Sequence, residues 1–253
     1  MPEPKKSAEG SFRWWEFYAV RYAMSTIVGG VIFYVLCSGT PILTPLASHI
    51  QYLAAFGLVY CYIASAPILV FHAGRFLLER PVLPTVGLVS VVAVVVGTLI
   101  WWLIPRQQIP CAVDVLFLVA VVASVFVLCL QGLIVWCALW QGDQMWHFYK
   151  KLSDRREDAN KGGVVESYRH LREHGNSFFI VLLEILLGVV LVVTSAVVGL
   201  TPTPLKPPTK IIPLDSRFVL LLLILIVWIL PAVLVWLIAT QFERKFADPP
   251  PQV

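Results

Sequence analysis

Two side chains of opposite charge, Arg21 and Glu184, lie inside long apolar segments of the sequence, at 17–38 and 178–199. A lone charge in hydrocarbon costs about 2.5–3.5 kcal/mol on insertion scales, so such charges are usually paired or functional. Arg21 lies about seven residues after the pair Trp14-Trp15, and Glu184 lies about eight after Asn176, so similar depths are expected. We therefore predict an intramembrane ion pair between Arg21 and Glu184.

Two other interpretations of these charges stay open. In one, Arg21 extends its long side chain to the lipid headgroups while a protonated Glu184 hydrogen-bonds to a neighbouring helix. In the other, Glu184 lines a pore or relays protons, because an ionisable group inside a membrane is a candidate for either task.

Small residues accompany both charges. Ser25, Gly29 and Gly30 follow Arg21, and Gly188 stands one helical turn after Glu184. Small residues four positions apart let membrane helices approach closely, which is a main source of packing energy in lipid. The pattern predicts that the first and fifth apolar segments form the tightest helix contact of the protein. The alternative explanation is that these small residues make no special contact, because small residues are common in membrane helices.

Three potential metal ligands, Glu166, His170 and His174, are spaced at i, i+4 and i+8, which places them on one face of a helix. An ordinary polar surface is the interpretation that the sequence favours, because nothing aligns a fourth ligand with them. The chain has only 5 histidines, whereas membrane di-iron enzymes use several His-rich boxes. We expect no cofactor.

Basic residues gather in the polar segment 141–176, where 7 Lys and Arg residues stand against 6 Asp and Glu residues. Such a balance is typical of a solvated face or a protein contact, although a local cluster of this kind also suits a nucleotide or a lipid headgroup. No nucleic-acid partner is indicated. The candidate ligand or partner surface consists of Lys150, Lys151, Arg155, Arg156, Arg169 and Arg172.

Catalytic patterns are missing from the sequence, which contains no Gly-x-Ser-x-Gly, no phosphate-binding Gly-rich loop and no His-Glu-x-x-His. We therefore expect a protein that is not an enzyme. One further polar residue, Gln131, lies deep in an apolar segment. An amide in hydrocarbon needs a partner, so Gln131 is predicted either to line a pathway or to take part in helix packing.

The elements that carry these residues follow from composition. The chain is 58% hydrophobic and 13% charged, far from the roughly 25% charged residues of soluble domains. Runs of about 18 or more apolar residues predict transmembrane helices. We predict an all-α integral membrane protein with six such helices, at 17–38, 52–72, 82–104, 112–140, 178–199 and 217–240.

Orientation follows from the distribution of positive charge, because loops rich in Lys and Arg stay in the cytoplasm. Of the 19 Lys and Arg residues, all but Arg106, Lys206, Lys210 and Arg217 lie on one side of the predicted spans. Both termini are therefore predicted to be cytoplasmic, in a multi-pass protein of the inner (plasma) membrane. The predicted domains are a disordered cytoplasmic tail (1–13), helices 1–4 (14–140), a cytoplasmic helical hairpin (141–176), helices 5–6 (177–242) and a tail (243–253).

The hairpin is predicted in detail. The fourth span has no helix breaker at its end, so it is expected to continue unbroken towards Asp158. Gly162-Gly163 would form the turn, and a returning helix from Val164 to His174 would stop at Gly175-Asn176. The second, third and sixth spans contain few polar residues and are expected to serve as a lipid-compatible scaffold.

These features favour an oligomeric, channel-like membrane protein that is gated or regulated through its hairpin. One copy lacks a dense polar site at mid-membrane, so a permeation route would be built between copies. The alternative is a sensor or scaffold that recruits a soluble cytoplasmic protein or a small nucleotide, and a lipid-modifying membrane enzyme ranks third. In size and layout, though by no motif, the chain resembles the membrane effectors of bacterial anti-phage defence, which a soluble partner or nucleotide signal activates. That likeness implies the same kind of partner.

Overall fold

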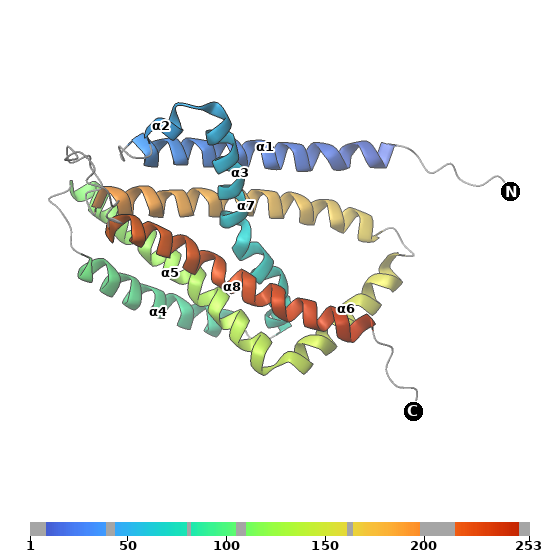
Figure 1. Cartoon of the computed structure of the whole chain (residues 1–253). Helices are drawn as coiled ribbons and strands as arrows, with labels where there is room; N and C mark the ends of the chain where they lie inside the picture. Colours follow the sequence, from blue (N-terminus) through green and yellow to red (C-terminus); the bar gives the residue numbers. More distant parts are fainter. Residues whose placement is uncertain are drawn as a thin grey trace.

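Every ordered element of the protein is a helix in the part that the computed structural model describes, residues 9–38, 44–79, 82–104, 110–160, 164–197 and 216–247. The elements are α1 (Glu9–Ser38), α2 (Thr44–Ala47), α3 (Ile50–Ala73), the 3-10 helix η1 (Gly74–Glu79), α4 (Val82–Leu103), α5 (Cys111–Trp140), α6 (Gly142–Asn160), α7 (Val164–Val197) and α8 (Ser216–Ala247) (Figure 1).

Six of these helices are long and apolar enough to cross a membrane, as predicted. The crossing segments are Arg21–Ser38, Ile50–Leu77, Pro84–Leu103, Cys111–Trp140, Gly175–Val197 and Val219–Gln241. A helix satisfies its backbone hydrogen bonds internally, which is why it is a stable form for an apolar segment in lipid. The protein is therefore a multi-pass, all-helical membrane protein. The side on which its termini lie, and the membrane that holds it, stay predictions.

Helices α3 and α7 form the centre of the bundle. In the span of α7, 56% of the residues are buried, and in that of α3 39%, against 17% in each of α4 and α8. Helix α3 contacts α1, α5, α7 and α8, and it crosses α1 and α7 steeply in Figure 1. The second span was expected to be lipid-compatible scaffold, and this expectation is wrong, because α3 lies among its neighbours instead of at the edge.

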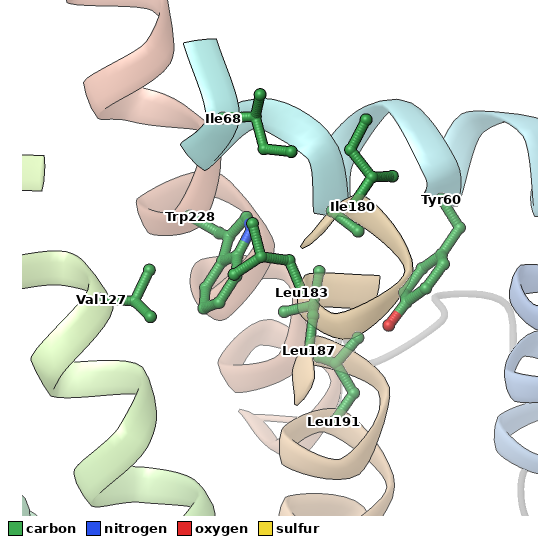
Figure 2. Close-up of a cluster of buried hydrophobic side chains, with 9 residues drawn as sticks. Tyr60, Ile68, Val127, Ile180, Leu183, Leu187, Leu191 and Trp228 are labelled. Carbon is green, nitrogen blue, oxygen red and sulfur yellow. The ribbon is translucent and has the colours of Figure 1, made fainter. Parts of the chain in front are cut away.

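A stripe of apolar side chains on α7 joins the central helices. Ile180, Leu183, Leu187 and Leu191 recur every three or four residues, which places them on one face of the helix. Figure 2 shows this stripe beside Trp228 of α8, with other side chains of the cluster from α3 and α5 around it. Lipid tails are as apolar as leucine, so such contacts stabilise the bundle by close packing and not by exclusion of water.

The segment after the fourth span differs from its prediction. Helix α5 ends at Trp140, and α6 begins at Gly142 after a change of backbone direction at Gln141. The expected unbroken helix towards Asp158 is therefore wrong. The bend costs little hydrogen bonding, because the Gln141 amide still donates to the Cys137 carbonyl at 2.8 Å and the Gln141 carbonyl accepts from the Met145 amide at 3.0 Å.

Helix α7 also departs from expectation, because it runs from Val164 to Val197 without stopping at Gly175-Asn176. A glycine within a helix costs about 1 kcal/mol relative to alanine. Ending a helix where the chain enters lipid exposes backbone groups at a larger cost, about 2–7 kcal/mol for each unpaired group. Continuity is therefore the cheaper solution. The place of α6 and the first turns of α7 outside the membrane stays a prediction.

Candidate functional site

The closest approach of two backbones lies between α1 and α3, at facing glycines. A Cβ atom on Gly29 would stand 2.7 Å from the carbonyl oxygen of Gly57, and one on Gly57 would overlap the carbonyl oxygen of Thr26. These neighbours are backbone atoms and cannot rotate away. The most extensive helix contact is thus between α1 and α3. The prediction that the first and fifth spans form the tightest contact is wrong, because Gly57 lets α3 occupy that place.

The predicted small residues nevertheless also connect α1 with α7. Gly188 forms a recess for Ile32, whose Cδ1 atom a Cβ at Gly188 would overlap. The same Cβ would stand 3.1 Å from the Tyr60 hydroxyl oxygen. Gly30 approaches Leu53 on α3, with 3.3 Å between a built Cβ and the Leu53 carbonyl oxygen. All four small residues chosen from the sequence therefore lie on helices that meet, and α1, α3 and α7 form a three-helix contact.

Tyr60 bonds α3 to α7 at Glu184, the acidic residue within the fifth span. Its hydroxyl donates a hydrogen bond of 2.8 Å to the backbone carbonyl oxygen of Glu184. The Tyr60 side chain is buried, and in Figure 2 its ring reaches towards α7. Sequence reasoning missed both Tyr60 and Gly57. One feature of the sequence could have indicated them. Tyr60 lies in mid-span, three residues after Gly57, whereas tyrosines of membrane proteins usually lie at the interface.

Glu184 is fully buried, at 0% exposure, and neither of its carboxyl oxygens has a hydrogen-bond partner within the described part of the chain. The Ser25 hydroxyl, also fully buried, and the backbone of Gly29 lie close enough to act on this carboxyl, although the geometry of a formed hydrogen bond is lacking. Cys61 lies beside Ser25. We call Glu184, Ser25, Tyr60 and Cys61 the Glu184 site.

The structure brings Arg21 to the same region but does not hydrogen-bond it to Glu184. Arg21 is partly exposed one helical turn before Ser25, and its charge acts on Cys61. Ser25 and Gly29, not Arg21, are the α1 residues that face the carboxyl. No hydrogen bond joins the two side chains in this conformation, because the rotation of α1 directs its small residues to Glu184. The ion pair between Arg21 and Glu184 stays a prediction.

A second buried polar group lies on α5. Gln131 has 0% exposure, and neither of its amide atoms has a partner among the side chains that the structure describes. One turn before it, Val127 belongs to the cluster of Trp228, and Ile134 after it packs with Ala232. Gln131 thus lies inside the bundle, on the stretch of α5 that meets α8. Its role in a pathway or in packing stays a prediction.

Helix α6 is anchored on the end of α3. The Tyr149 hydroxyl lies 2.8 Å from the carbonyl oxygen of His72 and 2.7 Å from that of Ala73, and it donates to this pair. The last carbonyls of a helix have no partner within the helix, so Tyr149 satisfies groups that would otherwise need water. Met145, 3% exposed, packs with Phe76 and Cys137 at the same junction. The predicted hairpin is thus joined to the membrane helix that holds Tyr60.

The basic surface and the metal ligands predicted from the sequence are only partly covered by the structure. Lys150, Lys151 and Arg155 are exposed on α6, and the Lys150 ammonium lies 5.4 Å from the centre of the Trp146 ring. The remaining predicted side chains lie outside the described residues: Arg156, Arg169, Arg172, Glu166, His170 and His174. Within the described part, no three His, Cys, Asp or Glu residues stand close enough to hold a metal ion.

No protein-family model, curated protein or solved structure matches this chain. The features of the chain that bear on function are therefore the Glu184 site and the junction of α6 with α3.

Proposed function

We propose that this chain is a channel-like membrane protein, assembled from several copies and regulated through α6 and the first turns of α7. The observation that carries this proposal is a series of contacts from α6 to the buried residue Glu184. Tyr149 of α6 bonds to the end of α3, and Tyr60 of α3 bonds to the Glu184 backbone on α7.

This series supplies a means of regulation. A ligand or partner that moves α6 pulls on the last carbonyls of α3 through Tyr149. Helix α3 meets α1 by backbone contact at Gly57, so a shift of α3 alters the contact with α1 and the bond to α7 together. Packed helices tend to have discrete arrangements, so a small displacement at one end favours one of two states.

Assembly from several copies follows from where the polar groups lie. Within the described spans, Glu184 and Gln131 are enclosed, and each stands apart from a continuous polar lining. In the spans of α4 and α8 only 17% of the residues are buried. A route for ions through one copy would need a row of polar groups. Such a route is more readily built around a symmetry axis between copies.

The test is ion flux through liposomes that contain the purified full-length chain. Tyr149→Phe removes the hydroxyl that bonds to α3 and keeps the ring in place. We expect flux to change several-fold, because α6 is then uncoupled from α3. Tyr62→Phe is the matched control, since Tyr62 is 62% exposed on the surface of α3. Wild-type protein that stays silent with and without nucleotides, or equal flux in the two variants, would contradict the proposal.

A second candidate function is recruitment of a soluble partner, as in a membrane sensor, a scaffold or an effector of anti-phage defence. The exposed cations Lys150, Lys151 and Arg155 on α6 favour it, because they suit an acidic protein surface or a phosphate group. Replacing Lys150 and Lys151 with Gln would then abolish capture of the partner without lowering the midpoint of thermal unfolding in detergent. Unchanged capture by this double variant would exclude the candidate.

A further inference from the structure

We propose that Glu184 is a proton-binding site inside the membrane, and that the bound proton holds α1, α3 and α7 in their packed arrangement. This inference deepens the proposed function by naming a ligand of the same site, the proton, and it rests on that function only where conduction is concerned.

The first step is the charge state of Glu184 in the packed structure. Its side chain is fully buried, and neither oxygen accepts a hydrogen bond from any described group. Burying an ionised carboxylate without a partner costs far more than burying a neutral carboxyl group, so a group in this position takes up a proton. The packed arrangement is therefore the protonated one, in which the carboxyl is an uncharged O–H group.

The second step is the set of groups around the carboxyl. Helix α1 brings Ser25 and, one turn away, Arg21, and helix α3 brings Tyr60 and Cys61. Helices α5 and α8 add no charge at this level. Asp114, the only charged residue of α5, accepts a hydrogen bond of 3.0 Å from Trp101 near the first turn of α5, and residues 219–241 of α8 contain no charged residue. Arg21 is thus the one cation near the site within the described spans.

The third step is that loss of the proton requires the helices to move. The space beside the site is closed, because Gly29 touches Gly57 by backbone and Gly188 is covered by Ile32. Glu184 itself has 0% exposure, so water does not reach its side chain in this arrangement. When the O–H bond breaks and the proton leaves for the aqueous phase, the carboxylate needs a new partner. Separation of α1 from α7, with Arg21 turned towards Glu184, supplies it.

The protonated and the deprotonated form of Glu184 would thus have different conformations. The first is the packed structure, and the second contains the ion pair that the sequence predicts. The protonated form has Glu184 enclosed without a hydrogen bond to Arg21, as observed. The deprotonated form has the two charges paired and the three-helix contact loosened. Proton binding would thus regulate the same contact that α6 reaches through α3.

The test is infrared spectroscopy of the full-length protein in lipid across a range of pH. A protonated carboxyl group has a carbonyl band separate from those of carboxylates and amides. Wild-type protein should show such a band at neutral pH, lose it as pH rises, and differ from Glu184→Gln by this band. Asp114→Asn is the matched control and should keep it. A wild-type spectrum that matches Glu184→Gln at every pH would overturn the proposal.

Thermal unfolding in detergent gives a second readout with a defined sign. The neutral form is the one that packing favours, so wild-type stability should be present at low pH and fall as pH rises through the titration of Glu184. Glu184→Gln is permanently neutral and close in shape, so the fall should disappear. A fall in stability with pH that is equal in wild type and Glu184→Gln would refute the coupling of protonation to packing.

A third variant, Arg21→Gln, removes the partner of the deprotonated form. The infrared band of the protonated carboxyl should then persist to a higher pH, corresponding to at least tenfold lower proton concentration.

These measurements are independent of ion flux. A pH-dependent band from Glu184 in a protein that does not conduct would support the proton site and refute the channel. Flux that depends on Tyr149, in a protein without the band, would support the channel and refute the proton site.

Discussion

Two of the contacts that hold the Glu184 site together are made to backbone atoms and not between side chains. Tyr60 bonds to the carbonyl oxygen of Glu184, and Gly57 meets the backbone of α1. Contacts of this kind are rigid, because backbone atoms of a helix cannot change rotamer. They hold Glu184 at a fixed place between three helices. Because its position is fixed, a change in the packing of these helices changes the surroundings of its carboxyl group.

Gly57→Ala tests this contact directly. The added methyl group would overlap the carbonyl oxygen of Thr26, so we expect a destabilisation of about 1–3 kcal/mol, the usual cost of overpacking. Gly87→Ala is the control, because a Cβ at Gly87 meets no atom within 4 Å. Thermal unfolding in detergent should show a lower midpoint for Gly57→Ala alone. Equal midpoints in the two variants would mean that α1 and α3 are not in backbone contact.

At the scale of elements, the boundaries of two helices are not those that helix-breaking residues predict. Both keep the backbone hydrogen-bonded instead. Helix α5 ends in an apolar run without a breaker, and α7 continues through Gly175-Asn176. The bend at Gln141 lets α6 turn onto the end of α3, where Tyr149 and Met145 dock. Because α7 is continuous, residues 164–174 belong to the same helix as Glu184. The part of the chain predicted to form the hairpin is thus connected to the Glu184 site in two ways, through α3 and through α7 itself.

Gly175→Ala distinguishes a continuous α7 from a helix that stops. Alanine within a helix is more favourable than glycine by about 0.5–1 kcal/mol, and a Cβ at Gly175 meets no neighbour within 4 Å. We therefore expect the variant to be more stable, with a higher midpoint of thermal unfolding. If a helix instead ended at Gly175 in a left-handed conformation, alanine would lower the midpoint.

At the scale of the whole molecule, burial is unequal among the six spans. In the span of α7, 56% of the residues are buried, whereas only 17% are buried in the spans of α4 and α8. Exposed apolar surface suits lipid, and it also suits contact with a second copy. The enclosed polar groups leave one copy without a lined route, and this is the reason for proposing assembly.

Native mass spectrometry of the detergent-solubilised protein tests that assembly. We expect a single mass at a whole-number multiple, greater than one, of the 28.3 kDa chain. The same multiple should persist in Tyr149→Phe, because the lost hydrogen bond lies within one chain. A purely monomeric protein that still conducts ions would contradict the proposed route between copies.

The sequence by itself determined the class of the protein and the six spans. Hydrocarbon admits few alternatives to a helix of about 20 apolar residues, so composition alone decides these features. It also singled out Glu184 and Gln131, because a polar residue in such a span is conspicuous.

Only the tertiary structure decided which helices touch and which faces they turn to each other. It placed α3 at the centre, set Gly57 and Tyr60 beside α1 and α7, and left Glu184 buried without a hydrogen bond to Arg21. The physical reason is that lipid solvates all apolar faces almost equally, so hydrophobic pattern does not mark the buried face of a membrane helix. Helix rotation and crossing depend instead on the fit of several helices at once, and that fit is not visible in any one segment.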